Sequence, residues 1–131
     1  MSEWLRDDYC FACGKANPYG LKLKISTRED GYAETEFLPA REYQGYQGVM
    51  HGGIAATILD EIMVYAASGL GKSVATAKLT VRYKRPIPIG KPLKAIGKIK
   101  SVKGRRVEGI GKIIDKSGLV LAEAEALMIE V

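Results

Sequence analysis

The fold is decided by the stretch Gln47-Gly48-Val49-Met50-His51-Gly52-Gly53-Ile54-Ala55-Ala56-Thr57-Ile58-Leu59-Asp60-Glu61-Ile62-Met63. It opens with glycine-rich backbone around the only histidine of the chain, and helical periodicity then runs over residues 54–68. Apolar residues recur every fourth position with apolar neighbours beside them, which makes one broad stripe. The stripe comprises Ile54, Ala55, Ile58, Leu59, Ile62, Met63 and Ala66. This pattern predicts a long helix whose apolar side is buried.

The opposite side of this helix is also short of polar groups. At 100° per residue it carries Gly53, Ala56, Asp60, Val64 and Ala67, of which only Asp60 is charged. A helix that is apolar on both sides is usually buried on both sides. We therefore expect one side to face its own sheet and the other to face a second subunit, with Asp60 at that interface and largely withdrawn from water.

The start of the helix has the chemistry of a donor site. Gly52 and Gly53 leave N–H groups unshielded by any Cβ, and the positive end of the helix dipole adds to them. Such donors polarise a carbonyl, and a carboxylate such as Asp60 can act as a base. Eight residues at 1.5 Å each separate Gly52 from Asp60 by about 12 Å, too far for one site. Two antiparallel helices related by a two-fold axis would bring them together, so the spacing predicts a homodimer with two shared sites.

Strand patterns surround the helix. Alternation or short β-rich runs, separated by turn residues, predict strands over residues 21–27, 32–38, 74–84, 93–102, 105–114 and 119–129. Glu29-Asp30-Gly31 is a hairpin turn, and residues 2–8 are expected to form a short helix. Residues 39–47 form a loop rich in Tyr and Gln. No repeat or linker divides the chain, so residues 1–131 are expected to form a single domain, with residues 1–19 as a lead-in.

His51-Gly52-Gly53 followed by an aspartate nine positions after the histidine resembles the hotdog-fold acyl-CoA thioesterases, in particular the phenylacetyl-CoA-type (PaaI-like) group. The resemblance extends from about Gly20 to Val131. It implies an α+β hotdog fold, in which a curved antiparallel β-sheet of five to six strands wraps a long central helix. It also implies that Asp60 acts as general base or nucleophile, and that the Gly52 amide, directly after His51, polarises the thioester carbonyl. We count His51 with these two among the expected catalytic residues.

The resemblance implies further site residues. Thr76 matches the position of a hydroxyl that orients the attacking water, although a surface threonine on a strand fits the sequence equally well. Relatives place an amide side chain before the helix where this chain has Gly45, so Gln44 or Gln47 would have to replace it. We include Gly53 among the substrate-binding residues because it adjoins the donor amide.

A basic turn offers a phosphate site. Lys103, Gly104, Arg105 and Arg106 concentrate positive charge at a predicted hairpin tip, which suits phosphate binding. The resemblance implies that coenzyme A phosphates lie near this hairpin and near Arg85. The alternative is that the turn is simply a solvated, charged tip.

Cys10-Phe11-Ala12-Cys13-Gly14 leaves three interpretations open: structural packing, a metal shared between subunits, or a redox pair. A structural zinc needs four ligands, and the other half of such a site is absent from the sequence. Nothing around the cysteines indicates a thioredoxin-like unit. We therefore predict no metal. The arrangement Cys-x-x-Cys-Gly followed by Asn17-Pro18-Tyr19-Gly20-Leu21 also resembles a lead-in found in one subgroup of these thioesterase-like proteins.

The formal net charge of +5 and the pI near 9.2 suit an anionic partner such as coenzyme A or nucleic acid, although a merely basic surface fits as well. Nucleic-acid binding is disfavoured because the basic residues lack interleaved exposed aromatics. No stretch resembles a signal or a membrane span, so we expect a cytoplasmic protein without a membrane partner.

The sequence thus predicts hydrolysis of acyl-CoA or aryl-CoA thioesters by a homodimer or a homotetramer. No cofactor is expected, because coenzyme A is part of the substrate. Two alternatives remain, a non-catalytic acyl-CoA-binding or regulatory module and a hotdog dehydratase. The position of Asp60 favours an enzyme over a binding module, since binding alone gains nothing from a buried carboxylate.

Overall fold

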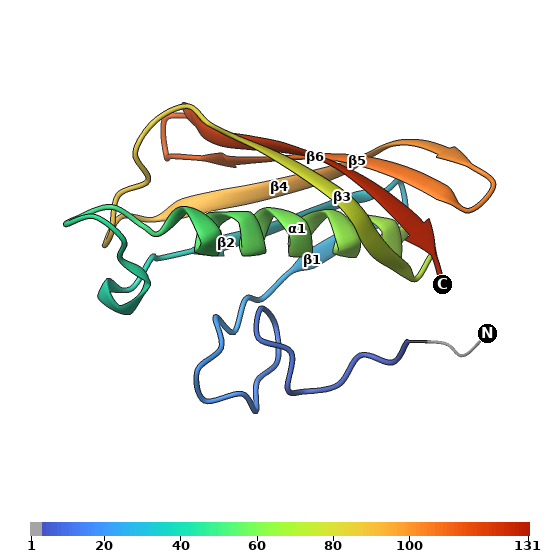
Figure 1. Cartoon of the computed structure of the whole chain (residues 1–131), viewed down its shortest axis with the longest axis horizontal. Coiled ribbons are helices and arrows are strands. Elements are labelled where there is room, and N and C mark those ends of the chain that lie inside the picture. Colours follow the sequence, from blue (N-terminus) through green and yellow to red (C-terminus); the bar gives the residue numbers. More distant parts are fainter. Residues whose placement is uncertain (1–3) are drawn as a thin grey trace.

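A computed structural model describes residues 4–131, and its central element is helix α1 (Gly52–Gly69), which lies across one face of a six-stranded sheet (Figure 1). The strands are β1 (Ser26–Arg28), β2 (Tyr32–Phe37), β3 (Val74–Tyr83), β4 (Leu93–Lys103), β5 (Arg106–Ile114) and β6 (Val120–Glu130). A short 3-10 helix, η1 (Arg41–Tyr43), interrupts the loop before α1.

The sheet is antiparallel throughout, in the order β1-β2-β4-β5-β6-β3. Strands β4, β5 and β6 follow one another as hairpins, whereas β3 leaves the end of α1 and pairs with β6 at the edge. The strand ends of β2 to β6 agree with the sequence prediction to within one residue. A curved antiparallel sheet around one long helix confirms the predicted hotdog fold (Figure 1).

The apolar stripe of α1 makes the core, as predicted. Its buried members are Ala55, Ile58, Leu59, Ile62, Met63, Ala66 and Ala67, of which Ala67 was expected on the opposite side. The helix lies very close to β4, because a Cβ on Gly97 would come within 2.7 Å of the Ile62 carbonyl oxygen. Glycine at this position therefore sets the distance between helix and sheet.

The first strand is much shorter than predicted. Only Ser26–Arg28 pairs with β2, and the prediction for residues 21–25 is wrong. Alternating burial is present there, but Lys22 has a positive φ of 54°, which breaks the extended run. The N–H groups of Leu21 and Leu23 donate instead to the carbonyls of Phe11 and Ala12. The alternation of apolar and polar residues over 21–25 therefore reflects packing against the lead-in and not pairing with a neighbouring strand.

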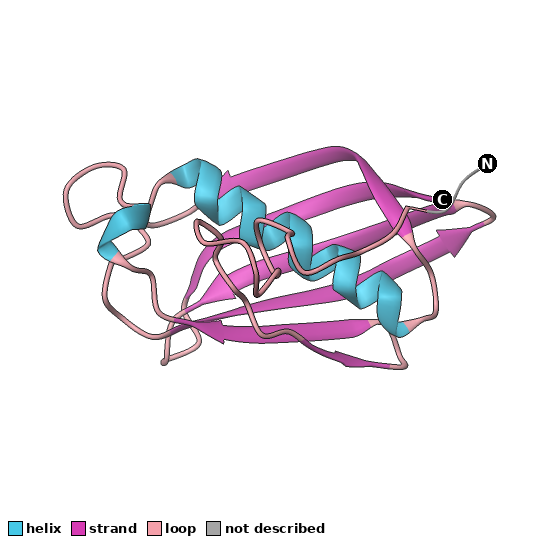
Figure 2. Cartoon of the chain, turned by 90° about the horizontal axis from the view of Figure 1, so that it is seen from below, coloured by secondary structure: helices cyan, strands magenta, loops and turns pink. Residues whose placement is uncertain are grey.

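The lead-in crosses the side of α1 that faces away from the sheet (Figures 1 and 2). Residues 4–8 form no helix, contrary to prediction, and residues 2 and 3 lie outside the described part. The Arg6 guanidinium stacks over the Tyr65 ring at 4.0 Å, and the Cys10 thiol donates to Glu61. The lead-in thus covers Glu61 and Tyr65, which neighbour the helix face expected to meet a second subunit.

Between residues 4 and 131, none of the helices is both long and apolar enough to cross a membrane.

Candidate active site

The start of α1 is capped by the histidine side chain. His51 is the N-cap residue, and its Nδ1 accepts a hydrogen bond from the Gly53 N–H at 2.9 Å. An Nδ1 that accepts a hydrogen bond carries no proton, which leaves Nε2 as the ring nitrogen that can donate. His51 thus consumes one of the two glycine donors predicted at this helix start, and the Gly53 amide is no longer free.

The Gly52 amide remains available. Its N–H makes no hydrogen bond to any residue between 4 and 131, while the Gly52 carbonyl accepts from the Tyr83 hydroxyl at 2.6 Å. A Cβ on Gly52 would approach the Tyr83 ring to 3.3 Å. Strand β3 therefore fixes the helix start through Tyr83, a residue that sequence reasoning had placed only in the alternation of that strand. One free donor at a helix N-terminus suits a carbonyl oxygen or an anion.

Asp60 and Thr76 meet between α1 and β3. The Thr76 hydroxyl donates to Asp60 Oδ1 at 2.6 Å, in a half-buried position. Simple alternation would put Thr76 on the same face as Lys78, away from the helix. The register of β3 against β6 shifts between these two residues, however, and this bulge turns Thr76 toward α1. The contact occupies one carboxylate oxygen and leaves Oδ2 for another partner.

Gly52 and Asp60 do not meet within one chain. Both lie on α1, and the helical rise separates them by about 12 Å. The surrounding helix surface, at Ala56, Asp60 and Val64, is only half-buried in the single chain. The Gly52 N–H and the Asp60 carboxylate of one chain are therefore too far apart to act on the same substrate carbonyl.

The loop before α1 is stabilised by hydrogen bonds and close contacts among its own residues. Gln44 Oε1 accepts from the Gly48 N–H at 2.8 Å, so this amide oxygen supports the loop. Gly45 lies directly against His51, where a Cβ would come within 3.1 Å of the His51 Cα. Gln47 is exposed. The sequence offered the side-chain amides of Gln44 and Gln47 as replacements for the amide that relatives carry at the position of Gly45. The Gln44 amide is engaged within the loop, which leaves the Gln47 amide for that role.

The predicted phosphate-binding residues fall into two places. Arg85 lies two residues after the end of β3, at the end of the molecule where α1 begins, because Tyr83 contacts Gly52. Lys103, Gly104, Arg105 and Arg106 form the β4–β5 hairpin tip at the other end of the helix (Figure 1). Arg105 is already engaged, since its guanidinium donates to the Glu130 carbonyl through two nitrogens, at 3.2 and 3.0 Å.

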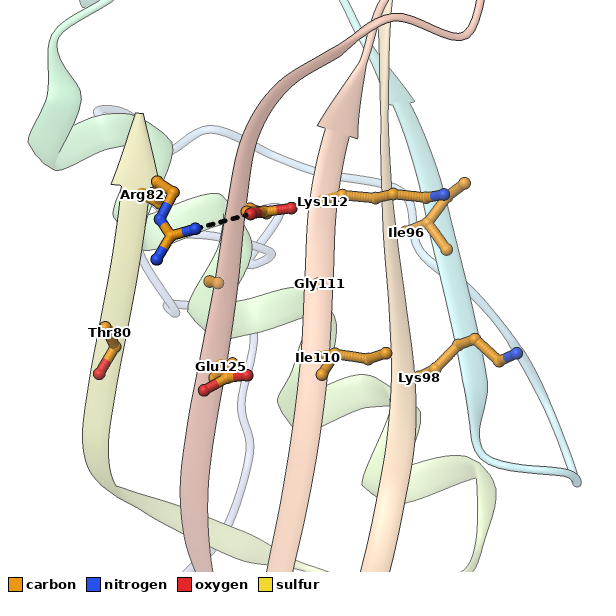
Figure 3. A pocket seen from close by; sticks show the side chains of 10 residues that line it. Thr80, Arg82, Ile96, Lys98, Ile110, Gly111, Lys112 and Glu125 are labelled. Carbon is orange, nitrogen blue, oxygen red and sulfur yellow. Dashed lines mark ion pairs between the residues drawn. The ribbon is translucent and has the colours of Figure 1, made fainter. Parts of the chain in front are cut away.

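Two hollows differ in character. One lies next to the start of α1. Most of its lining residues are apolar or aromatic, and three are charged: Leu21, Leu23, Phe37, Leu38, Pro39, Tyr43, Met50 and Ile58, together with Lys22, Lys24 and Glu36. The other is on the outer face of the sheet, where Arg82 and Glu123 form an ion pair at 3.8 Å (Figure 3). The helix lies behind the sheet in this view, so the outer hollow is remote from Asp60 and Gly52.

The cysteine pair lies beside a carboxylate that sequence reasoning missed. Cys10, Cys13 and Glu61 place their ligand atoms within 4.8 Å of one another. Burial first, and then the hydrogen bond with Glu61, raise the pKa of the Cys13 thiol to about 12. This shift disfavours redox work by Cys13, which needs a thiolate, and it means that a bound metal would have to displace the thiol proton. No local signal could have found Glu61, because 51 residues separate it from Cys10.

Comparison with known proteins identifies the class. The sequence profile described as "Thioesterase superfamily" matches residues 47–122. The chain is 37% identical to a Xenopus laevis protein named acyl-coenzyme A thioesterase THEM4, over 72% of this chain and 43% of that protein. The protein belongs to the thioesterase superfamily. It spans less than half the length of this curated relative.

Solved structures agree with this assignment. A thioesterase superfamily protein of 31% identity superposes with a TM-score of 0.88, over 98% of this chain and 71% of that one. The Escherichia coli PaaI protein of the phenylacetic acid degradation operon shares the fold at 17% identity, with a TM-score of 0.79 over 85% and 80%. A Streptococcus pneumoniae thioesterase-like protein, solved with coenzyme A, is 19% identical, with a TM-score of 0.78 over 83% and 85%.

Proposed function

We propose that this protein hydrolyses acyl-CoA thioesters to a free acid and coenzyme A. The observation that carries the proposal is a pair of reactive features on one helix: a free Gly52 N–H at its N-terminus and an Asp60 carboxylate held by Thr76. Membership of the thioesterase superfamily, and the name of the Xenopus laevis relative, support the same reaction.

The chemistry follows from the two features. Asp60 takes a proton from water through its free oxygen, and the resulting hydroxide adds to the thioester carbonyl carbon. The carbonyl oxygen becomes an oxyanion, which the Gly52 N–H and the helix dipole stabilise. The C–S bond then breaks, and coenzyme A leaves as the thiol with the proton that Asp60 had taken. Thr76 keeps Asp60 oriented throughout. No cofactor enters this scheme.

Each site is proposed to draw on two chains. About 12 Å along α1 is too far for Asp60 to activate a water at the carbonyl that Gly52 polarises. Antiparallel pairing of two helices about a two-fold axis brings the Asp60 of one chain to the Gly52 of the other. The small and apolar residues around Asp60, including Ala56 and Val64, allow such close approach.

The substrate is proposed to use both ends of the molecule. The apolar hollow near the start of α1, lined by Tyr43, Met50 and Ile58 among others, suits an apolar acyl group. Basic side chains at Arg85, Lys103 and Arg106 suit the phosphates of coenzyme A. In an antiparallel dimer, the β4–β5 hairpin tip of one chain and the start of the partner's helix lie at the same end. The coenzyme A in the Streptococcus pneumoniae structure supports this class of ligand.

The decisive test is removal of the base. Asp60→Asn keeps the shape of the side chain and its contact with Thr76, but removes the negative charge. We expect kcat for acyl-CoA hydrolysis to fall by about 100-fold or more, the usual scale for a general base. Thiol release from a panel of acyl-CoA and aryl-CoA esters measures it. Near-normal turnover in Asp60→Asn together with a large loss in Glu61→Gln would mean that the neighbouring carboxylate is the base.

Two further structures of the Streptococcus pneumoniae protein bear on Thr76. Two variants of that protein have been solved, one with an aspartate and one with a threonine replaced by alanine, and the two positions have the same 16-residue separation as Asp60 and Thr76. We therefore include Thr76 in the proposed site, as the residue that positions Asp60.

A further inference from the structure

Three potential metal ligands converge between the lead-in and α1. Two are the thiols of Cys10 and Cys13, and the third is the Glu61 carboxylate. All three ligand atoms lie within 4.8 Å of one another, and the Cys10 sulfur is 3.5 Å from Glu61 Oε2. The group thus joins two parts of the chain that are distant in sequence.

These distances are close to those around a tetrahedral zinc ion. Bond lengths of about 2.3 Å to sulfur and about 2.0 Å to oxygen place a sulfur and an oxygen about 3.5 Å apart, and two sulfurs about 3.8 Å apart. The Cys10–Glu61 separation already has this value. The other two distances are at most 4.8 Å, so the side chains need to close in by no more than about 1.3 Å to reach tetrahedral spacing.

The loop that carries the thiols is held in shape by its own backbone. The Gly14 N–H donates to the Cys10 carbonyl at 2.8 Å, which closes a tight turn around Cys13. A Cβ on Gly14 would collide with the backbone of Asp8 and Cys10, so only glycine fits there. Phe11 and Ala12 are anchored from the other side by Leu21 and Leu23. A loop of this kind presents two thiols in one direction.

The Glu61 carboxylate accepts from the Cys10 thiol, but no cationic side chain between residues 4 and 131 pairs with it. Glu61 is nevertheless half-buried beside two thiols. A half-buried charge is normally paired or coordinates a metal. A zinc ion would neutralise Glu61 and the two thiolates together, whereas a Cys10–Cys13 disulfide would leave Glu61 without a partner.

We propose that Cys10, Cys13 and Glu61 bind one zinc ion, which fastens the lead-in to α1. Solvent supplies the fourth ligand through a groove that borders the site, lined in part by Arg6, Cys10, Glu61 and Val64. Both thiols lose their protons on binding, and these are released to solvent. With three protein ligands and one solvent position, the site is an open one, unlike a closed structural zinc centre with four protein ligands. It lies on α1 one residue past Asp60, and no step of the proposed hydrolysis passes through it, so the inference does not depend on that reaction.

Metal binding is measured directly on the full chain. The protein is treated with a chelator under a phosphine reductant and then titrated with zinc against a chromophoric competitor, and with cobalt as a spectroscopic probe. We expect one zinc per chain, and thiolate-to-cobalt charge-transfer absorption that zinc abolishes. At a zinc concentration about 100 times the Kd, the Tm should rise by about 5–10 °C.

Variants separate the ligands from the fold. Cys13→Ser should lose the charge-transfer band and the zinc-dependent rise in Tm, and Glu61→Gln should weaken zinc binding by about tenfold or more. Glu125→Gln, an exposed carboxylate on the outer face of the sheet, should change neither. The metal-free Tm of each variant shows whether it folds.

Zinc and cobalt binding by the wild-type chain tests the proposal even if a variant fails to fold. Absence of zinc and cobalt binding by the reduced wild-type protein would overturn the proposal. A preparation isolated without metal, 2 Da lighter than the reduced chain and unable to bind zinc after reduction, would identify the pair as a disulfide instead.

Discussion

The free amide of Gly52 can be removed with little other change, by Gly52→Pro. Proline is favoured at the first position of a helix, where its missing N–H costs no intrahelical hydrogen bond. The preceding residue, His51, has ψ of 131°, in the extended range that a following proline requires. The Gly52 N–H has no partner between residues 4 and 131. The substitution should therefore leave the fold intact and remove one donor.

The loss expected from that donor is large. Removing one oxyanion donor usually lowers kcat by about 10²–10³, equivalent to about 3–4 kcal/mol of barrier. Gly52→Ala is the matched control, because its Cβ meets the same Tyr83 ring at 3.3 Å but its N–H remains. We expect Gly52→Ala to keep most of its turnover. Circular dichroism and the Tm establish that both variants are folded, and thiol release measures kcat.

Mixing Gly52→Pro with Asp60→Asn then tests whether the site is shared. Each variant alone is expected to keep about a hundredth of wild-type activity or less. If every site takes its amide from one chain and its aspartate from the other, a mixed dimer has one site with both lesions and one intact site. Refolding an equal mixture makes about half the dimers mixed, so activity should return to about a quarter of wild type. Near-normal turnover in Gly52→Pro, or no recovery in the mixture of folded variants, would refute this reasoning.

Two further predictions concern stability and substrate binding. Gly97→Ala should lower the free energy of unfolding by about 3 kcal/mol in urea titrations, because its Cβ would lie 2.7 Å from the Ile62 carbonyl oxygen. Its cross-strand partner Gly111 is the control: a Cβ there has no contact below 3.4 Å, so Gly111→Ala should cost no more than about 1 kcal/mol. Equal effects of the two substitutions would show that helix and sheet are not held at this distance. Lys103→Ala combined with Arg106→Ala should raise KM for acyl-CoA about tenfold and leave the hydrolysis of a short thioester without the nucleotide unchanged, and an equal loss on both substrates would exclude a role in binding coenzyme A phosphates.

The sequence alone determined the features that depend on local periodicity. Apolar residues at every fourth position specified α1, because the helical repeat places them on one face whatever surrounds them. Alternation and turn residues located β2 to β6 to within one residue at each end. The His51-Gly52-Gly53 start and Asp60 could be singled out in the same way, since both belong to one helix and their spacing follows from its rise.

Tertiary structure decided whatever depends on contacts between distant segments. Residues 21–25 alternate like a strand but pack against the lead-in, because the N–H groups of Leu21 and Leu23 bond to Phe11 and Ala12. Thr76 reaches Asp60 only because a bulge in β3 shifts its register, and alternation cannot reveal a bulge. Glu61 lies beside Cys10 and Cys13 because the lead-in folds back across α1, 51 residues away. Periodicity fixes which way a side chain points along its own element, and only the packing of elements against one another fixes what it meets.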